Sequence, residues 1–135
     1  MDDADTGNLN GTWSNVYEDW ITTIKINTSA KSIEYIGAYK GTIANSPDFS
    51  AANGVLIIQF TKYWEWDSLD ENPDKAGKYG ALYWRDLKPD SVYMADAYTG
   101  FAHTMFEKYS DAEAAFTPDN AGDYVDWSIV GIYTK

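Results

Sequence analysis

The 135-residue chain has the length of one domain, and its 44% hydrophobic and 23% charged residues are typical of a globular protein with its own core. A formal net charge of −11, with Arg85 as the single arginine, excludes nucleic acid as a partner, because phosphate contacts require clustered Lys and Arg. The absence of cysteine excludes disulfides, thiol catalysis and thiolate metal sites. Six Trp and eleven Tyr exceed the needs of a core and indicate a binding surface.

The first nine residues differ in character from the rest of the chain. Residues 1–9 are polar and acidic, and we interpret them as a flexible tether ahead of a single domain over residues 10–135. They do not have the pattern of a secretory signal. We favour a chain from which a leader has been removed, and the alternative is a natural cytoplasmic start with an acidic end.

Short apolar and β-branched runs separated by turn residues predict consecutive antiparallel strands at the start of the domain. We expect these strands over residues 11–17, 20–27 and 31–43. The third strand is long enough to need a bend, which we place at Gly37 or Gly41 because glycine tolerates the coiling of a barrel strand.

The strongest strand pattern is the nearly continuous run of β-formers over residues 54–61. It predicts a buried strand that continues through residues 63–66. Residues 67–78 are rich in charged side chains without periodicity and are expected to form a loop. Two more strands are expected over residues 79–86 and 91–99.

The last third of the chain combines helical and strand patterns. Residues 110–116 predict a short helix, with Ser110 as its N-cap and Glu113 completing a capping box. Thr117-Pro118 predicts a brief second helical start, and a final strand is expected over residues 124–133. The whole pattern predicts an all-β fold, an antiparallel up-and-down barrel of about eight strands with one short helix before the last strand.

The segment Gly11-Thr12-Trp13 resembles the Gly-x-Trp signature that opens the first strand of lipocalins and other members of the calycin group. The resemblance implies a lipocalin-like barrel in which Trp13 closes the base and Gly11 lets the entering strand turn sharply. Members of the group tend to place an Arg or Lys over this tryptophan. Arg85 is the candidate for that position.

Most of the chain is also similar to small, uncharacterised Treponema-type lipoproteins of spirochaetes. The similarity runs from Gly54 onwards and is carried by residues 79–87, 90–92, 111–116 and 126–128. It implies a cell-envelope or extracellular location, with a signal peptide and a lipid-bearing cysteine that are no longer present. The lipid would then be the chain's only link to a membrane.

Avidins share the calycin barrel and place an Asn two residues after Gly-Thr-Trp, where it holds the ligand carbonyl. Asn15 matches that position, and Tyr39 matches a tyrosine of the third avidin strand. The later Trp-containing strands of avidins are not reproduced in this sequence. We therefore do not expect biotin to be the ligand.

Aromatic and acidic residues alternate over residues 63–72, and such residues at a barrel mouth can stack on a ligand and accept its hydrogen bonds. Trp64 and Trp66 share one face of the expected strand. The alternative is that both tryptophans only cover the end of the barrel. The acids of residues 67–74 offer oxygen ligands for calcium, but their spacing is not that of an EF-hand and a solvated loop is the favoured interpretation.

Catalytic patterns are missing from the sequence. His103 is the sole histidine, which excludes a multi-histidine zinc site, and we interpret it as a loop residue. The chain has no nucleophile-elbow motif and no phosphate-cradling glycine loop. Paired carboxylates are chemically possible, but this barrel is small for a glycosidase. We predict no enzymatic activity, no cofactor and no metal.

We therefore predict an envelope protein that binds a small, partly apolar ligand in or at the mouth of a barrel. The alternative is an adhesin-like surface interaction module that binds a host protein or a polysaccharide through exposed aromatics on a packed barrel. A barrel of about eight strands is just wide enough to be open or filled. The oligomeric state stays undetermined. The predicted ligand-binding residues are Asn15, Tyr17, Tyr39, Trp64, Trp66, Tyr83, Arg85 and Tyr93.

Overall fold

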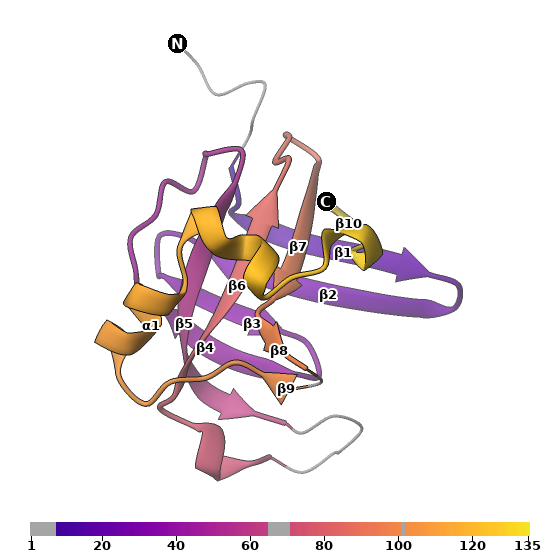
Figure 1. Ribbon diagram of the computed structural model, residues 1–135. Coiled ribbons are helices and arrows are strands. Elements are labelled where there is room, and N and C mark those ends of the chain that lie inside the picture. Colours follow the sequence, from indigo (N-terminus) through magenta and orange to yellow (C-terminus); the bar gives the residue numbers. More distant parts are fainter. Residues whose placement is uncertain (1–7, 65–70, 101) are drawn as a thin grey trace.

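The computed structural model describes residues 8–64, 71–100 and 102–135 (Figure 1). Within these ranges eight strands close into one antiparallel barrel, in the order β1-β10-β7-β6-β5-β4-β3-β2. Strands β1 to β7 pair with their neighbours in sequence, and β10 closes the barrel between β1 and β7. The predicted all-β, up-and-down barrel with a short helix before its last strand is confirmed.

The barrel strands are β1 (Gly11–Tyr17), β2 (Trp20–Asn27), β3 (Ser32–Tyr35), β4 (Tyr39–Ile43), β5 (Gly54–Tyr63), β6 (Tyr79–Arg85), β7 (Ser91–Asp96) and β10 (Ile132–Thr134). A small separate hairpin is formed by β8 (Tyr98–Thr99) and β9 (Ala102–His103). The helical elements are α1 (Tyr109–Ala115) and the 3₁₀ segments η1 (Pro73–Lys75), η2 (Pro118–Asp123) and η3 (Trp127–Ile129). The strands predicted over residues 11–17 and 20–27 are confirmed without change.

The single strand predicted over residues 31–43 is a hairpin. Strands β3 and β4 pair with each other, with Tyr35 opposite Tyr39. Gly37 lies in the turn between them with φ of 85°, a conformation that glycine adopts without strain. The glycine therefore reverses the chain, where the prediction had it bend one strand.

The final strand predicted over residues 124–133 is mostly wrong, because β10 begins only at Ile132. The Asp126 side chain accepts hydrogen bonds from the backbone N–H and the hydroxyl of Ser128, at 3.1 and 2.6 Å. This local turn starts η3 and competes with an extended strand. The strand predicted over residues 91–99 is also interrupted, since β7 ends at Asp96.

Helix α1 is present where a helix was predicted, but the predicted cap is wrong. Its N-cap is Lys108, without a side-chain cap hydrogen bond, and Ser110 lies inside the first turn. The helix starts early because Tyr109 packs on Tyr79 with ring centroids 5.8 Å apart. Glu113 accepts a hydrogen bond from the Tyr109 hydroxyl at 3.0 Å in place of closing a capping box.

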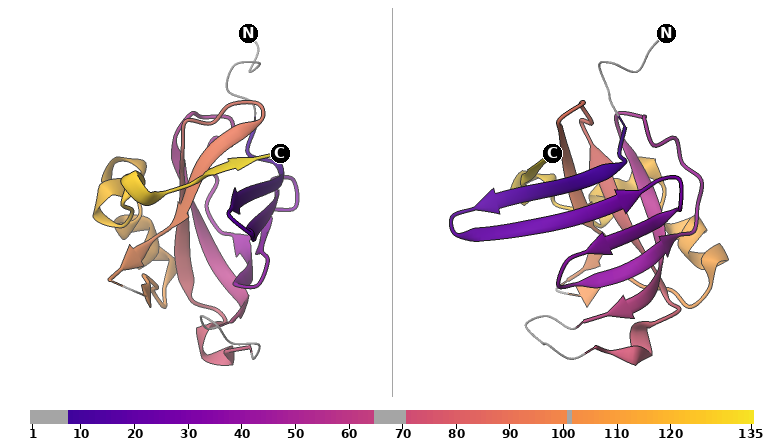
Figure 2. Two further views of the ribbon diagram at one scale, coloured as in Figure 1. Left: turned by 90° about the vertical axis from the view of Figure 1, so that its right-hand side faces the viewer. Right: turned by 180° about the vertical axis from the view of Figure 1, so that it is seen from behind.

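Strand β5 is buried on both faces, which explains its nearly continuous run of apolar residues. Its inward side chains, such as Leu56 and Ile58, belong to the core inside the barrel. Its outward side chains Val55 and Ile57 pack in a second cluster with residues of the C-terminal segment, including Phe116. Figure 2 shows α1 and the helical segments that follow it, in orange and yellow, gathered on one side of the barrel over this outer face.

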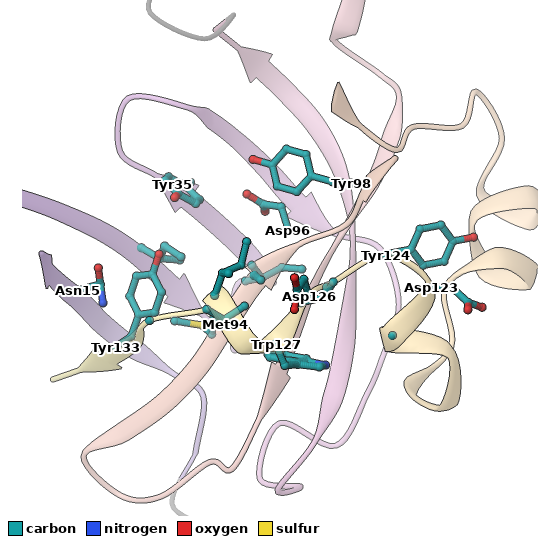
Figure 3. A pocket seen from close by; sticks show the side chains of 18 of the residues that line it. Asn15, Tyr35, Met94, Asp96, Tyr98, Asp123, Tyr124, Asp126, Trp127 and Tyr133 are labelled. Carbon is teal, nitrogen blue, oxygen red and sulfur yellow. The ribbon is translucent and has the colours of Figure 1, made fainter. Parts of the chain in front are cut away.

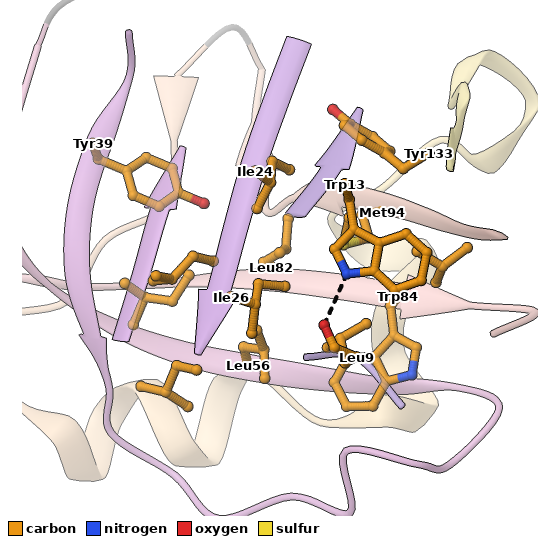
Figure 4. Close-up of a cluster of buried hydrophobic side chains, with 14 of the residues drawn as sticks. Leu9, Trp13, Ile24, Ile26, Tyr39, Leu56, Leu82, Trp84, Met94 and Tyr133 are labelled. Atoms are coloured by element: carbon orange, nitrogen blue, oxygen red, sulfur yellow. Dashed lines mark hydrogen bonds between the residues drawn. The ribbon is translucent and has the colours of Figure 1, made fainter. Parts of the chain in front are cut away.

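The base of the barrel is closed by indole rings (Figure 4). Trp13 is fully buried, and its Nε1 donates a hydrogen bond to the Leu9 carbonyl at 2.8 Å. Trp84 is also buried and donates to the Ala51 carbonyl at 2.9 Å. The expectation that Trp13 plugs the base agrees with this geometry. Leu9 is itself fully buried, so the packed barrel begins one residue before the predicted boundary.

The cation over Trp13 is Lys135, whose Nζ lies 4.7 Å from the ring centroid. Arg85, the candidate from the sequence, lies on the outer face 5.1 Å from the Trp127 ring, so that assignment is wrong. Gly11 has φ of 137°, and a Cβ there would lie 2.8 Å from Lys135 Cε. Glycine at this position lets the chain end pass across the barrel base.

Candidate functional site

The barrel wall is incomplete before the start of β10 at Ile132. Strand β10 pairs with β7 only at Ser91 to Tyr93 and meets β1 at the single pair Ser14 and Thr134. The Asn15 Nδ2 donates to the Ile132 carbonyl at 2.8 Å and extends this short seam. The residues before Ile132 lie outside the wall, so β7 has no β10 partner at residues 94–96.

A cavity of about 670 Å³ lies at this gap, between the end of the lumen and the segment of residues 122–131 (Figure 3). Cavities of this size are typical of sites for small molecules. Apolar and aromatic side chains form much of its wall: Tyr35, Leu82, Met94, Tyr98, Trp127 and Tyr133. The barrel therefore has a packed base and an open mouth.

Asp96 is the one charged side chain that is buried among the described residues, with 6% of its surface exposed. It lies at the end of β7 and lines the cavity, and in Figure 3 its carboxylate lies between the rings of Tyr35 and Tyr98. The Tyr39 hydroxyl donates to its Oδ1 at 2.6 Å. Burial of a carboxylate without hydrogen bonds destabilises a fold, so the hydrogen bond from Tyr39 helps to hold Asp96 in place.

His103 holds the other side of the Asp96 carboxylate. Its Nε2 lies 3.2 Å from Asp96 Oδ2, and its Nδ1 lies 2.6 Å from the Tyr63 hydroxyl. A neutral imidazole protonated on Nε2 satisfies all three groups, because Nε2 then donates to Asp96 and Nδ1 accepts from Tyr63. His103 lies in β9 and is half-buried, so its interpretation as a loop residue is wrong.

A bulge in β5 brings Tyr63 to this array. The register between β4 and β5 shifts at Lys40 and Gly41, so that Gly41 pairs with Phe60 while Tyr39 pairs with Tyr63. The extra residue turns Tyr63 inward, on the same side as Phe60, although the two are an odd number of residues apart. The bulge is therefore what allows Tyr63 to reach His103.

Burial raises the pKa of four tyrosines around the mouth, and the charge of Asp96 contributes to each shift. The pKa of Tyr133 rises to about 12. The pKa values of Tyr35, Tyr39 and Tyr98 rise further above the ordinary value of 10. These hydroxyls therefore stay protonated at neutral pH and can donate hydrogen bonds.

Two of the predicted ligand-binding residues are at this site. Asn15 lines the cavity, although its Nδ2 is engaged by the Ile132 carbonyl. Tyr39 lies behind Asp96 and orients it. Trp64 is half-buried and forms an isolated bridge with Glu71, away from the described lining of the cavity.

Trp66 and residues 67–70 lie outside the described residues. Within the described part of the predicted acidic loop, the Asn72 side chain caps η1 by accepting from the Asp74 N–H at 3.0 Å. Where the structure describes the chain, no group of three or more His, Cys, Asp or Glu side chains is placed to hold a metal. Because residues 67–70 lie outside the described residues, the choice between a solvated loop and a calcium site stays untested.

Four predicted ligand-binding residues lie elsewhere. Tyr83 faces outward from β6 and donates to Asn120 Oδ1 at 2.8 Å, while its neighbours Leu82 and Trp84 take the lumen side. Arg85 and Tyr93 share the outer face as directly paired residues of β6 and β7. Tyr17 is 69% exposed near the tip of the β1–β2 hairpin. Their aromatic or charged character did not reveal which face of the strand they occupy.

The β1–β2 hairpin extends beyond its neighbouring strands, as the right-hand view of Figure 2 shows. Its end carries four exposed apolar side chains on paired positions, with Val16 opposite Ile21 and Tyr17 opposite Trp20. Trp20 is 76% exposed. The alternative prediction, a surface interaction module, expected exposed aromatic residues at Trp64 and Trp66. Among the described residues, this apolar tip presents such exposed aromatics instead.

The sequence reasoning missed Asp96, His103, Tyr98 and Trp127 as site residues. One signal for Asp96 is present, since it follows Val92 and Met94 at a period of two and so shares their inward face. An acid in an inward apolar series calls for a buried partner. The partners themselves come from β4 and β9, and no local pattern connects them to β7.

Comparisons of the chain with protein-family models, with curated proteins and with solved structures find no match. The barrel is compatible with a lipocalin-like fold, while the likeness to lipocalins and to spirochaete lipoproteins stays a sequence resemblance. Among the described helices, none has the length and apolar character needed to span a membrane.

Proposed function

We propose that the protein is a non-enzymatic binding protein that takes a small, partly apolar ligand at the open mouth of its barrel. The observation that carries the proposal is the cavity of about 670 Å³ at the gap beside β7. Its wall combines aromatic rings with one buried carboxylate, Asp96, that is held in place by Tyr39 and His103. Small-molecule sites commonly combine aromatic and apolar side chains with a small number of placed polar groups.

The cell envelope is the proposed location. Its support is the resemblance to spirochaete lipoproteins, which also implies a lipid anchor. Fractionation of the source cells with an antibody against the barrel tests the location. Recovery in the cytoplasmic fraction would overturn it without affecting the binding proposal.

The ligand proposal is tested on protein purified directly from its host. Native mass spectrometry should find an added mass of a few hundred daltons that is lost on delipidation, together with a shift in tryptophan fluorescence. Trp127 is the one tryptophan among the described lining residues, so the Trp127→Phe variant should lose the fluorescence shift. A clean apo mass, and no response to added lipids or sugars, would contradict a small-ligand site.

The apolar tip supports a second candidate, a surface interaction module that binds a host protein or a polysaccharide. Contiguous exposed apolar side chains often mark interaction sites. The double variant Tyr17→Ser/Trp20→Ser removes the exposed rings and leaves the cavity lining unchanged. Loss of surface binding in this variant, with small-ligand binding retained, would assign the two activities to separate regions.

A further inference from the structure

The charges that line the cavity have one sign. Asp96, Asp123 and Asp126 are all part of its described wall, and that wall contains no Lys or Arg. The chain as a whole carries a net charge of −11, so the overall field of the molecule has the same sign as these side chains. A ligand with a carboxylate or phosphate group would meet repulsion here and no basic partner.

The Asp96 carboxylate keeps capacity for another donor. Its two oxygens offer about four acceptor positions, of which the Tyr39 hydroxyl and the His103 ring occupy two. Neither contact neutralises the charge when the imidazole is neutral. A ligand that donates hydrogen bonds to Asp96 and also carries a positive charge completes the site better than a neutral one.

Aromatic rings are placed around the same region. The Tyr98 ring stacks on His103 with centroids 4.6 Å apart and lines the cavity together with Tyr35 and Trp127. The faces of such rings attract an ammonium group, and their area accommodates the apolar part of a ligand. Rings beside a carboxylate, with no basic side chain in the described lining, form the usual environment of a bound organic cation.

We propose that the ligand of the mouth is an organic amine or quaternary ammonium compound with an aromatic or branched apolar group. The inference rests on the proposed binding function and names the ligand class of the same cavity. The ammonium group binds at Asp96 against the Tyr98 and Tyr35 rings. The apolar group lies along Leu82, Met94 and Trp127.

The test compares three probes of one skeleton that differ in charge: tryptamine, the neutral alcohol tryptophol, and the anion indole-3-acetate. Titrations by calorimetry on the delipidated wild-type protein are made in low salt at pH 8, above the usual titration range of imidazole. We expect tryptamine to bind at least about tenfold more tightly than tryptophol, and indole-3-acetate to bind most weakly.

The Asp96→Asn variant should bring the tryptamine and tryptophol affinities within about threefold of each other, because it removes the charge and keeps an acceptor for Tyr39. The matched control is Asp90→Asn, the same change of charge at an exposed residue in the turn between β6 and β7. It should leave the preference for the amine unchanged. If Asp96→Asn does not fold, Tyr98→Leu serves in its place, because Tyr98 is 41% exposed and its loss should reduce the same preference.

The outcomes separate the two proposals. If tryptophol binds as tightly as tryptamine, the cation inference is overturned and the binding function stands. If all three probes fail to bind at millimolar concentration, both proposals are overturned. An amine preference that Asp96→Asn and Asp90→Asn reduce equally would reflect overall charge, and it would overturn the assignment to Asp96.

Discussion

The two ends of the barrel are built from similar residues with different results. At the base, Trp13 and Trp84 fill the lumen, and each indole N–H is satisfied by a backbone carbonyl of the chain that crosses beneath. At the mouth, tyrosines surround a buried carboxylate and the wall is interrupted because β10 begins only at Ile132. Aromatic residues thus close one end by packing and leave the other open, because β10 covers β7 at residues 91–93 and is absent beside residues 94–96 at the mouth.

We expect the largest effect on the free energy of unfolding from a substitution at the base of the barrel. Trp13→Ala should lower the free energy of unfolding by about 3–5 kcal/mol, because it removes a fully buried indole and leaves a cavity. Urea denaturation followed by circular dichroism measures the change. A loss below about 1 kcal/mol would contradict the claim that Trp13 closes the barrel.

The raised tyrosine pKa values at the mouth predict alkaline sensitivity. The pKa of such a tyrosine is higher in the folded state than in the unfolded state. Its contribution to stability is complete at a pH below the unfolded-state pKa, and it is lost as the pH rises through the folded-state pKa. For Tyr133, with a pKa of about 12, the loss falls between pH 10 and 12 and amounts to about 2–3 kcal/mol. Urea denaturation across this range should show a smaller decline in Tyr133→Phe than in the wild type. Equal declines would contradict the prediction.

Two single Tyr→Phe substitutions compare the mouth with the outer face. Tyr39→Phe should cost about 1–3 kcal/mol of stability and weaken ligand binding, because the Asp96 carboxylate loses its 2.6 Å donor. Tyr83→Phe removes a hydrogen bond between neutral groups on the outer face and should cost about 1 kcal/mol without affecting the ligand. Thermal denaturation and the probe titrations measure both effects. If both variants changed the ligand affinity equally, the hydrogen bond from Tyr39 to Asp96 would have no particular role in ligand binding.

The smallest expected effect is at the apolar tip. Trp20→Ala should change the free energy of unfolding by less than about 0.5 kcal/mol, since the side chain is 76% exposed. Urea denaturation alongside Trp13→Ala gives the comparison directly. A large loss of stability would mean that Trp20 is covered in solution, as by a second copy of the chain, and sedimentation velocity would then show the larger species.

The sequence predicted the closed end of this molecule much better than the open one. The strand patterns of residues 11–17 and 20–27 gave the bounds of β1 and β2, and the resemblance of Gly11-Thr12-Trp13 to the lipocalin signature implied that Trp13 closes the base. The mouth depends on where β10 begins, and that follows from the local turn that Asp126 makes with Ser128. It also depends on the β5 bulge that turns Tyr63 toward His103. Such irregular features break the periodic patterns from which faces are predicted.

The indole N–H resonances of the tryptophans test the open mouth most directly, because they report on separate regions of the molecule. In ¹H–¹⁵N spectra of the wild-type protein, addition of the tightest-binding of the three probes should shift the Trp127 indole and the backbone amides of Asp96 and Tyr98. The Trp13 and Trp84 indoles, which are bonded at the base, should not move. Shifts confined to Trp20, or no shifts at all, would contradict a binding site at the mouth.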